Sequence, residues 1–325
     1  MERLKPGQEI SVHKKHQSPG INPANPIISK GVDLFVRRVE KKILIPLQPN
    51  YEDGFRDKFV EVIEDSDVLP VAVITHQSHS DCISAAKLSK DLTTLANQHR
   101  YPEEEFRGYM LSVAASMQSG HQNIVVQQYF ETTKSIASKY NLRLQTYVRQ
   151  KDENQYGISR SKNIQFSREL ARIINKQEDR QADGLIFFPE GTMEGGRKVI
   201  EGTKKGQING MQELDWESIH KLIKGIEERG RKVVIIPVGT HGEFRISNPS
   251  NKNYPTARVL KQLYNPLNIP RESILSVNVG MPMTYSEIKE ILAKQGIEPN
   301  PQNIGEYVGR TIAKLLPLEA RGVYA

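Results

Sequence analysis

The chain has 325 residues, enough for one large or two modest domains. Its single cysteine, Cys82, excludes an internal disulfide and a zinc site made of several thiolates. Hydrophobic residues make up 37% of the sequence, but no apolar run approaches the ~20 residues that a membrane-spanning helix needs. The net charge of +7 favours an anionic partner, which a nucleic acid, an anionic membrane or an anionic substrate would each satisfy.

The positive charge is concentrated near the N-terminus, where residues 1–50 contain nine basic and four acidic residues. After a proline-punctuated lead-in, a helix is expected from Ser29 to about Pro46. Its apolar residues recur at helical spacing, at Val32, Phe35, Val36, Val39 and Ile43, with basic residues on both flanks. This apolar stripe is expected either to pack on the body of the protein or to lie on a membrane surface. We therefore expect residues 1–67 to be a basic lead-in with an amphipathic helix.

Residues 68–325 alternate between buried strands and helices, which is typical of an α/β domain with a layered mixed sheet flanked by helices. The expected strands are 68–75, 184–188, 233–238 and 274–280. The expected helices are 80–96, 103–119, 124–140, 163–176, 215–228, 286–295 and 304–316. Thr284 and Glu287 have the spacing of a capping box. Because 97–146 has all-helical patterning between two strands, we expect a helical insertion there, beside the sheet.

A polar cluster follows the first strand of this domain, at the end where open α/β sheets place their sites. It contains His76 and Asp81, in the pattern H-x-x-x-x-D. A histidine with the ordinary pKa of about 6.5 is mostly neutral at pH 7 and can accept a proton from a hydroxyl group. Asp81 could hold the imidazole ring in the required tautomer. The alternative is structural: Asp81 as a first-turn helix acid and His76 as a polar loop residue.

Two further strands end in recognisable motifs, GLIFFPEGT at 184–192 and IIPVGTHG at 235–242. The order H-x-x-x-x-D, F-P-E-G-T and an I-P-V strand resembles the glycerol-3-phosphate and 1-acylglycerol-3-phosphate acyltransferase family. The resemblance covers roughly 68–316 and includes TKKG at 203–206 and VNVGMPMTYSEI at 277–288. It implies a glycerolipid acyltransferase-like fold and a role in phospholipid biosynthesis. It also implies an acyl-CoA or acyl-ACP donor, a phosphorylated glycerol acceptor, and neither a cofactor nor a metal.

The resemblance assigns roles residue by residue. His76 would be the general base and Asp81 its orienting carboxylate. The acceptor phosphate would lie at the Glu-Gly-Thr loop, which is formed by Glu190, Gly191 and Thr192. Where the family usually has an arginine after this loop, the chain has Met193, so its phosphate-binding cation must come from elsewhere. Arg149, which closes an expected strand at 142–149, is preferred, and the other candidates are Arg160, Lys162 and Arg197.

Several alternatives remain open at the level of sequence. The preferred acceptor is 1-acylglycerol 3-phosphate, while the helical segment 97–146 and the separate N-terminal part favour glycerol 3-phosphate. A metal-dependent hydrolase using His76, His79 and Asp81 is a rival, as is a non-catalytic lipid-binding relative. Nucleic-acid binding has no recognisable motif to support it. Cys82 is interpreted as a small buried apolar residue.

The expected location is the cytoplasm, because the N-terminus lacks the apolar segment of a signal peptide. An enzyme that acts on lipid precursors there would meet the bilayer peripherally, at the cytoplasmic face of the membrane.

Overall fold

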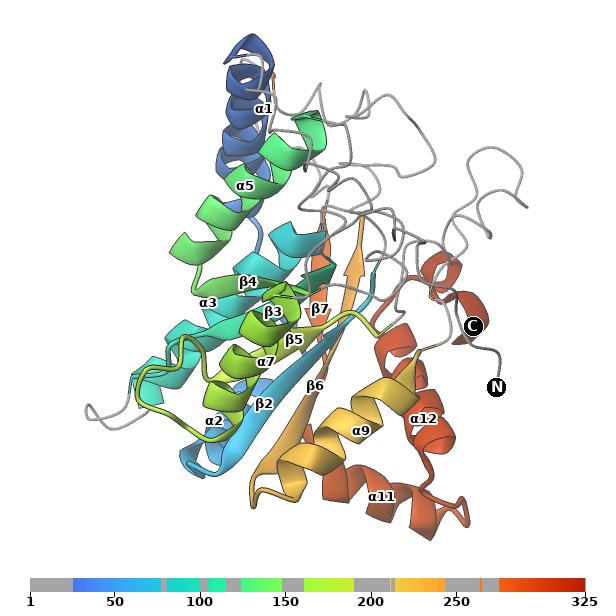
Figure 1. Cartoon of the computed structure of the whole chain (residues 1–325). Helices are drawn as coiled ribbons and strands as arrows, with labels where there is room; N and C mark the ends of the chain where they lie inside the picture. The colour runs from blue at the N-terminus through green and yellow to red at the C-terminus, as the bar shows by residue number, and fades with distance from the viewer. Residues whose placement is uncertain are drawn as a thin grey trace, which may run out of the picture.

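The computed structural model is an α/β protein built on a mixed sheet (Figure 1). The structure describes residues 26–76, 81–99, 105–114, 124–147, 161–189, 211, 214–242, 264 and 275–324. Eight strands are found in these ranges, with the order β1-β7-β6-β2-β5-β3-β4 and β8 paired to β6. They are β1 (Asn50–Tyr51), β2 (Val68–Ile74), β3 (Tyr109–Ala114), β4 (Leu142–Tyr147), β5 (Gly184–Phe187), β6 (Lys232–His241), β7 (Ser276–Val279) and β8 (Met283–Thr284).

Helices cover both faces of this sheet. One layer contains α1 (Pro26–Val39) with the π-helical turn η1 (Glu40–Leu44), α2 (Phe55–Glu64), α3 (Asp81–His99) and α5 (Ile124–Lys139). The other contains α7 (Ser161–Ile174), α9 (Trp216–Glu227), α11 (Tyr285–Lys294) and α12 (Pro301–Lys314), followed by the short turns η3 (Leu318–Ala320) and η4 (Gly322–Tyr324). The expected layered α/β architecture is therefore confirmed.

Strand β2 lies at the centre of the sheet, paired in parallel with β6 on one side and β5 on the other. All seven of its residues are buried. Leu69, Val71 and Val73 pack into the core on the α9 side, while Ala72 and Ile74 pack into the core on the α3 side. This two-sided burial explains why the sequence of β2 is continuously apolar rather than alternating.

The expected N-terminal helix is confirmed as α1 and η1. Val36, Val39 and Ile43 are buried in the core cluster that also contains residues of α2, α3 and the sheet. The predicted apolar stripe therefore packs on the body of the protein, which is one of the two outcomes that the sequence left open. Residues on both sides of position 67 belong to this one core cluster.

The expected helix at 103–119 is wrong, because Tyr109–Ala114 is the parallel strand β3. With β4 it lies inside 97–146, so this part of the chain is not a purely helical insertion. Gly108 precedes β3 with φ +107°, and a Cβ atom there would lie 2.0 Å from the carbonyl oxygen of Asn141. Only glycine can adopt this positive φ and lie this close to the Asn141 carbonyl group. The backbone at Gly108 is therefore not helical, and β3 begins at the next residue.

The remaining expected strands and helices are confirmed, with ends shifted by a few residues. Thr284 and Glu287 form a complete capping box at the start of α11. Gly296, with φ +72°, follows the end of that helix. Within the described ranges, no helix is both long and apolar enough to cross a bilayer.

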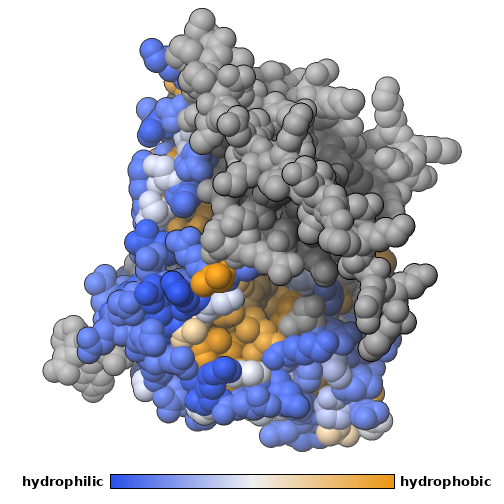
Figure 2. All heavy atoms as spheres, in the orientation of Figure 1, coloured by the Kyte–Doolittle hydropathy of each residue, from blue (hydrophilic) through white to orange (hydrophobic). Residues whose placement is uncertain are grey.

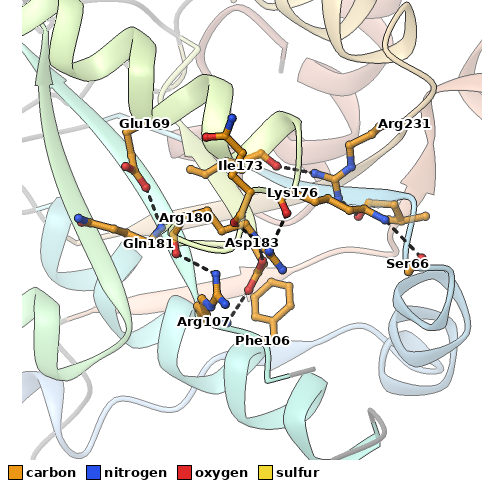
Figure 3. A network of polar contacts seen from close by, with 12 residues as sticks. Ser66, Phe106, Arg107, Glu169, Ile173, Lys176, Arg180, Gln181, Asp183 and Arg231 are labelled. Atoms are coloured by element: carbon orange, nitrogen blue, oxygen red, sulfur yellow. Dashed lines mark hydrogen bonds and ion pairs between the residues drawn. The ribbon is translucent and has the colours of Figure 1, made fainter. Parts of the chain in front are cut away.

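A polar network closes the sheet at the amino ends of its parallel strands (Figure 3). The buried carboxylate of Asp183 accepts hydrogen bonds from the Arg107 amide and from Arg180 Nε. Arg231, also buried, donates to the carbonyl oxygens of Ile173 and Val68 over 2.8 and 2.6 Å. The guanidinium group of Arg231 thereby joins the end of α7 to the start of β2.

We expect Arg231→Met to lower the free energy of unfolding by about 2 to 4 kcal/mol, because buried backbone carbonyls would lose their charged donor. Urea unfolding followed by circular dichroism measures the change. The matched control is Arg310→Met, which removes an exposed arginine paired with Glu306 and should stay within about 0.5 kcal/mol. A loss no larger than that of the control would contradict a structural role for Arg231.

Candidate active site

The two residues of the H-x-x-x-x-D pattern meet at the carboxyl end of β2. His76 follows the strand by two positions, and Asp81 is the first residue of α3. His76 Nδ1 lies 2.6 Å from Asp81 Oδ2, a hydrogen bond of the charge-assisted kind. The Asp81 side chain is 1% exposed and that of His76 is 13% exposed. The Asp81 carboxylate is therefore buried, whereas part of the His76 side chain is accessible to solvent.

This contact determines which ring nitrogen can act as a base. When Asp81 is ionised, His76 Nδ1 carries the proton that it donates to the carboxylate. The basic nitrogen of the neutral ring is then Nε2, on the opposite side of the imidazole. A proton taken up at Nε2 produces an imidazolium that the buried carboxylate stabilises. The geometry is that of an oriented general base.

The end of β2 is held in place by a pair of threonines. Thr75 Oγ1 accepts a hydrogen bond from the Thr240 amide at 2.9 Å and lies 2.9 Å from Thr240 Oγ1. Both side chains are buried, and the pair joins the ends of β2 and β6 immediately before His76. These hydrogen bonds hold the backbone immediately before His76 against β6.

Phe188 is a site residue that the sequence analysis did not assign. Its ring is stacked on that of His76, with centroids 4.7 Å apart and an interplanar angle of 19°. Phe188 directly follows β5, the parallel neighbour of β2, so adjacent strand ends bring the two rings together. The sequence signal for this residue was the position of the F-P-E-G-T motif at the carboxyl end of a strand, where sites are expected. The register between the two strands, which sets this contact, was not readable from the sequence.

Cys82 is buried against the core, as interpreted from the sequence. Burial in apolar surroundings raises the pKa of its thiol to about 12, and the neighbouring Asp81 carboxylate adds to the effect. A thiol with this pKa is almost entirely protonated at neutral pH and is a poor nucleophile. An acyl-cysteine intermediate at this position is therefore disfavoured.

The other predicted site residues are not placed by the structure. Arg149, Arg160, Glu190, Gly191, Thr192 and Arg197 lie outside the described residues, as does Met193. Lys162 is in the first turn of α7, at a position where only the backbone is described. The proposed phosphate site therefore stays a prediction, whereas His76 and Asp81 are brought together.

A metal centre was the rival interpretation of the same loop. In the part of the chain that the structure describes, no group of three or more His, Cys, Asp or Glu side chains is arranged to hold a metal ion. His79, the third proposed ligand, lies outside that part.

Comparison with known proteins adds no assignment. No protein-family model matches the chain, and no curated protein matches it at a significant level. The functional argument therefore depends on the residues and their geometry.

The environment of Cys82 makes a direct prediction about its reactivity. At pH 8 we expect iodoacetamide to leave the folded chain unmodified, because roughly one thiol in 10⁴ is ionised when the pKa is about 12. In denaturant the same residue should be alkylated completely. Intact-mass spectrometry reads both states from the chain's only cysteine. Rapid labelling of the folded protein would show that the thiol is accessible and ionised.

Proposed function

We propose that the chain is a glycerolipid-type O-acyltransferase acting in phospholipid biosynthesis. It would transfer a fatty acyl group from acyl-CoA or acyl-ACP to the hydroxyl of 1-acylglycerol 3-phosphate. The observation that carries the proposal is the 2.6 Å contact between His76 Nδ1 and Asp81 Oδ2 at the carboxyl end of a central parallel strand. The proposal is also supported by the sequence, because its motifs occur in the same order as those of the acyltransferase family that the chain resembles.

The proposed reaction is a direct transfer. His76 Nε2 removes the proton of the acceptor hydroxyl while the oxygen attacks the thioester carbonyl carbon. The tetrahedral oxyanion collapses, the carbon–sulfur bond breaks, and the new ester forms. The departing thiolate takes the proton from the His76 imidazolium, so the enzyme returns to its starting state. Asp81 orients the ring and stabilises its charged form throughout, as in hydrolase triads.

An apolar patch is exposed on one face of the sheet. Figure 2 shows apolar side chains gathered on the face of the sheet between α7 and α9. Partly buried apolar residues at this place are Phe166, Leu170, Phe187 and Leu222. Phe187 packs against the core on the α9 side, whereas Phe188, whose ring is stacked on that of His76, packs against the core on the α3 side. The patch is therefore on the opposite face of the sheet from the His76–Phe188 pair, and the proposed acyl site does not include it.

The acceptor preferred in this proposal is 1-acylglycerol 3-phosphate. One argument for glycerol 3-phosphate was an all-helical segment at 97–146, and that segment contains β3 and β4. The F-P-E-G-T motif still favours the monoacylated acceptor. Glycerol 3-phosphate is retained as the alternative substrate.

Substitution of the pair tests the mechanism. We expect His76→Ala to lower acyl transfer by at least about 10³-fold, because the base is lost. Asp81→Asn should cause a loss of about 10²- to 10⁴-fold, because the neutral amide no longer stabilises the imidazolium. Thiol release from an acyl-CoA measures both rates in the presence of acceptor.

The matched control is Cys82→Ala, which alters the residue next to Asp81 and should retain most activity. Circular dichroism of each variant verifies that it is folded. Full turnover by a folded His76→Ala chain would reject the mechanism. Absence of thiol release from the unaltered chain with every acceptor would reject the proposed activity.

A panel of acceptors tests the substrate assignment. With one acyl-CoA, we expect 1-acylglycerol 3-phosphate to give a higher kcat/KM than glycerol 3-phosphate, and non-phosphorylated glycerol to be inactive. Arg149→Ala should mainly raise KM for the phosphorylated acceptor, because a guanidinium group binds phosphate in a bidentate manner. An unchanged KM would move the phosphate-binding role to Arg160 or Arg197.

A further inference from the structure

The segment from α1 to Ile45 has two faces of different chemistry. Val36, Val39 and Ile43 face the core, where they pack with residues of α3 and α5. Because these positions are three or four residues apart, they lie along one side of the helix. The opposite side is left to the surface.

The outward face combines cations with large apolar side chains. In chain order it consists of Lys30, Leu34, Arg37, Lys41 and Ile45, all of them exposed and spaced by three or four residues. Leu34 is 53% exposed and Ile45 is 55% exposed. At 1.5 Å per residue, these two apolar side chains lie about 16 Å apart along the same stripe. Half-exposed side chains of this size are costly in water and favourable in contact with an apolar phase.

The charge on this segment is positive. Residues 30–45 contain five basic and two acidic residues. Both acids are engaged by cations within the fold: Asp33 pairs with Arg37 at 2.7 Å, and Glu40 lies 3.7 Å from Lys139 of α5. The outward face carries Lys30, Arg37 and Lys41. The Arg37 side chain remains 53% exposed although it pairs with Asp33. A negatively charged surface would complement these cations.

An aromatic side chain lies beside the same segment. The guanidinium group of Arg38 is 4.5 Å from the centre of the Tyr264 ring, and Tyr264 is 50% exposed. A tyrosine has an apolar ring and a polar hydroxyl, so it is suited to the boundary between lipid and water. Tyr264 extends the combination of cation and apolar surface beyond the helix itself.

The segment is located at the end of the molecule that bears the candidate site. In Figure 1, α1 and α5 pack side by side and stand beyond the carboxyl ends of the central strands. His76 follows the carboxyl end of β2. A surface contacted by α1 would therefore lie toward the site rather than toward the amino-end network of Figure 3.

We propose that the outward face of α1 and η1 docks the protein on an anionic lipid bilayer, with the helix lying in the plane of the interface. Leu34 and Ile45 enter the boundary of the acyl region, and Lys30, Arg37 and Lys41 contact anionic headgroups. The proposal goes beyond the proposed acyl transfer and does not depend on it. It also differs from the sequence expectation, since the stripe predicted to meet either the core or a membrane is the buried one.

A bilayer fits this face better than an acidic protein partner does. The two apolar side chains and the cations lie along one side of the helix, so a planar interface can contact them together. The positive charge would attract an acidic protein equally well. Leu34 and Ile45, however, are half-exposed aliphatic side chains about 16 Å apart. Covering both of them takes an extended apolar surface, which a bilayer provides.

Vesicle binding of the full chain tests the proposal. We expect co-sedimentation with vesicles of phosphatidylcholine and phosphatidylglycerol, little with phosphatidylcholine alone, and weakening by salt. Changing Lys30, Arg37 and Lys41 together to Gln should weaken binding about a hundredfold, at roughly fivefold per charge. The matched control changes three exposed lysines on α9, α11 and α12 to Gln: Lys224, Lys294 and Lys314. The control should bind as the unaltered chain does.

The apolar contribution is tested by a second pair of variants. Leu34→Ser with Ile45→Ser should weaken binding by about tenfold per side chain. The control is Ile297→Ser with Leu318→Ser, which removes exposed aliphatic residues elsewhere on the surface and should leave binding unchanged. Circular dichroism verifies that all variants are folded.

Three results would overturn the proposal. The first is absence of binding to anionic vesicles, which would redirect the face toward an acidic protein. The second is equal binding by the outward-face variants and their controls. The third is a loss of binding only when the basic residues before α1 are changed to Gln, namely Arg3, Lys5, Lys14 and Lys15.

The proposed activity can be judged separately from this surface. Vesicle binding is measured without substrate, so it does not depend on acyl transfer. Acyl transfer is measured without vesicles, using a water-soluble short-chain thioester, and the outward-face variants should retain it. Loss of one property with retention of the other identifies which proposal has failed.

Discussion

The two-sided burial of β2 is the constraint on which the rest of the structure depends. Each fully buried Val, Leu or Ile contributes roughly 1.5 to 3 kcal/mol relative to exposure, and β2 places all seven of its residues in the interior. A strand buried in this way needs hydrogen-bonded neighbours on both edges and helices on both faces. Strands β5 and β6 and the two helical layers supply them. The carboxyl end of β2 is consequently held by strand pairing on both edges and by packing on both faces.

The two ends of the sheet use their polar groups differently. At the amino ends, Asp183 accepts hydrogen bonds from Arg107 and Arg180, and Arg231 donates to backbone carbonyl groups. The charges there serve the fold. At the carboxyl end, His76 is partly exposed while its carboxylate partner is sealed. The candidate chemistry therefore lies where the fold leaves an ionisable group in reach of a substrate.

Much of the fold followed from local patterning. The continuous apolar runs of β2, β5 and β6 predict buried strands, and the caps of α11 are readable in the sequence. Strand β7 was also expected to be buried throughout, but only its alternate residues, Val277 and Val279, are buried. A helix was predicted in place of β3 because its six apolar and small residues, with polar residues on both sides, fit a helical pattern equally well. Helix α2 was not predicted, although Phe55, Phe59, Val62 and Ile63 recur at helical spacing and are buried. Periodicity over such short runs cannot separate strand from helix, since the pairing partner decides.

The sequence by itself determined that a histidine and an aspartate follow a buried strand. It also determined that the N-terminal helix has an apolar stripe with basic residues on both flanks. The tertiary structure decided what those residues contact. It placed the Asp81 carboxylate against one ring nitrogen of His76. It stacked the Phe188 ring on the His76 ring, although the two residues are 112 positions apart in the sequence. It also assigned Val36 and Val39 to the core, and Leu34 and Ile45 to the surface. The physical reason is that local sequence specifies which faces are apolar, whereas long-range packing specifies which of them are covered.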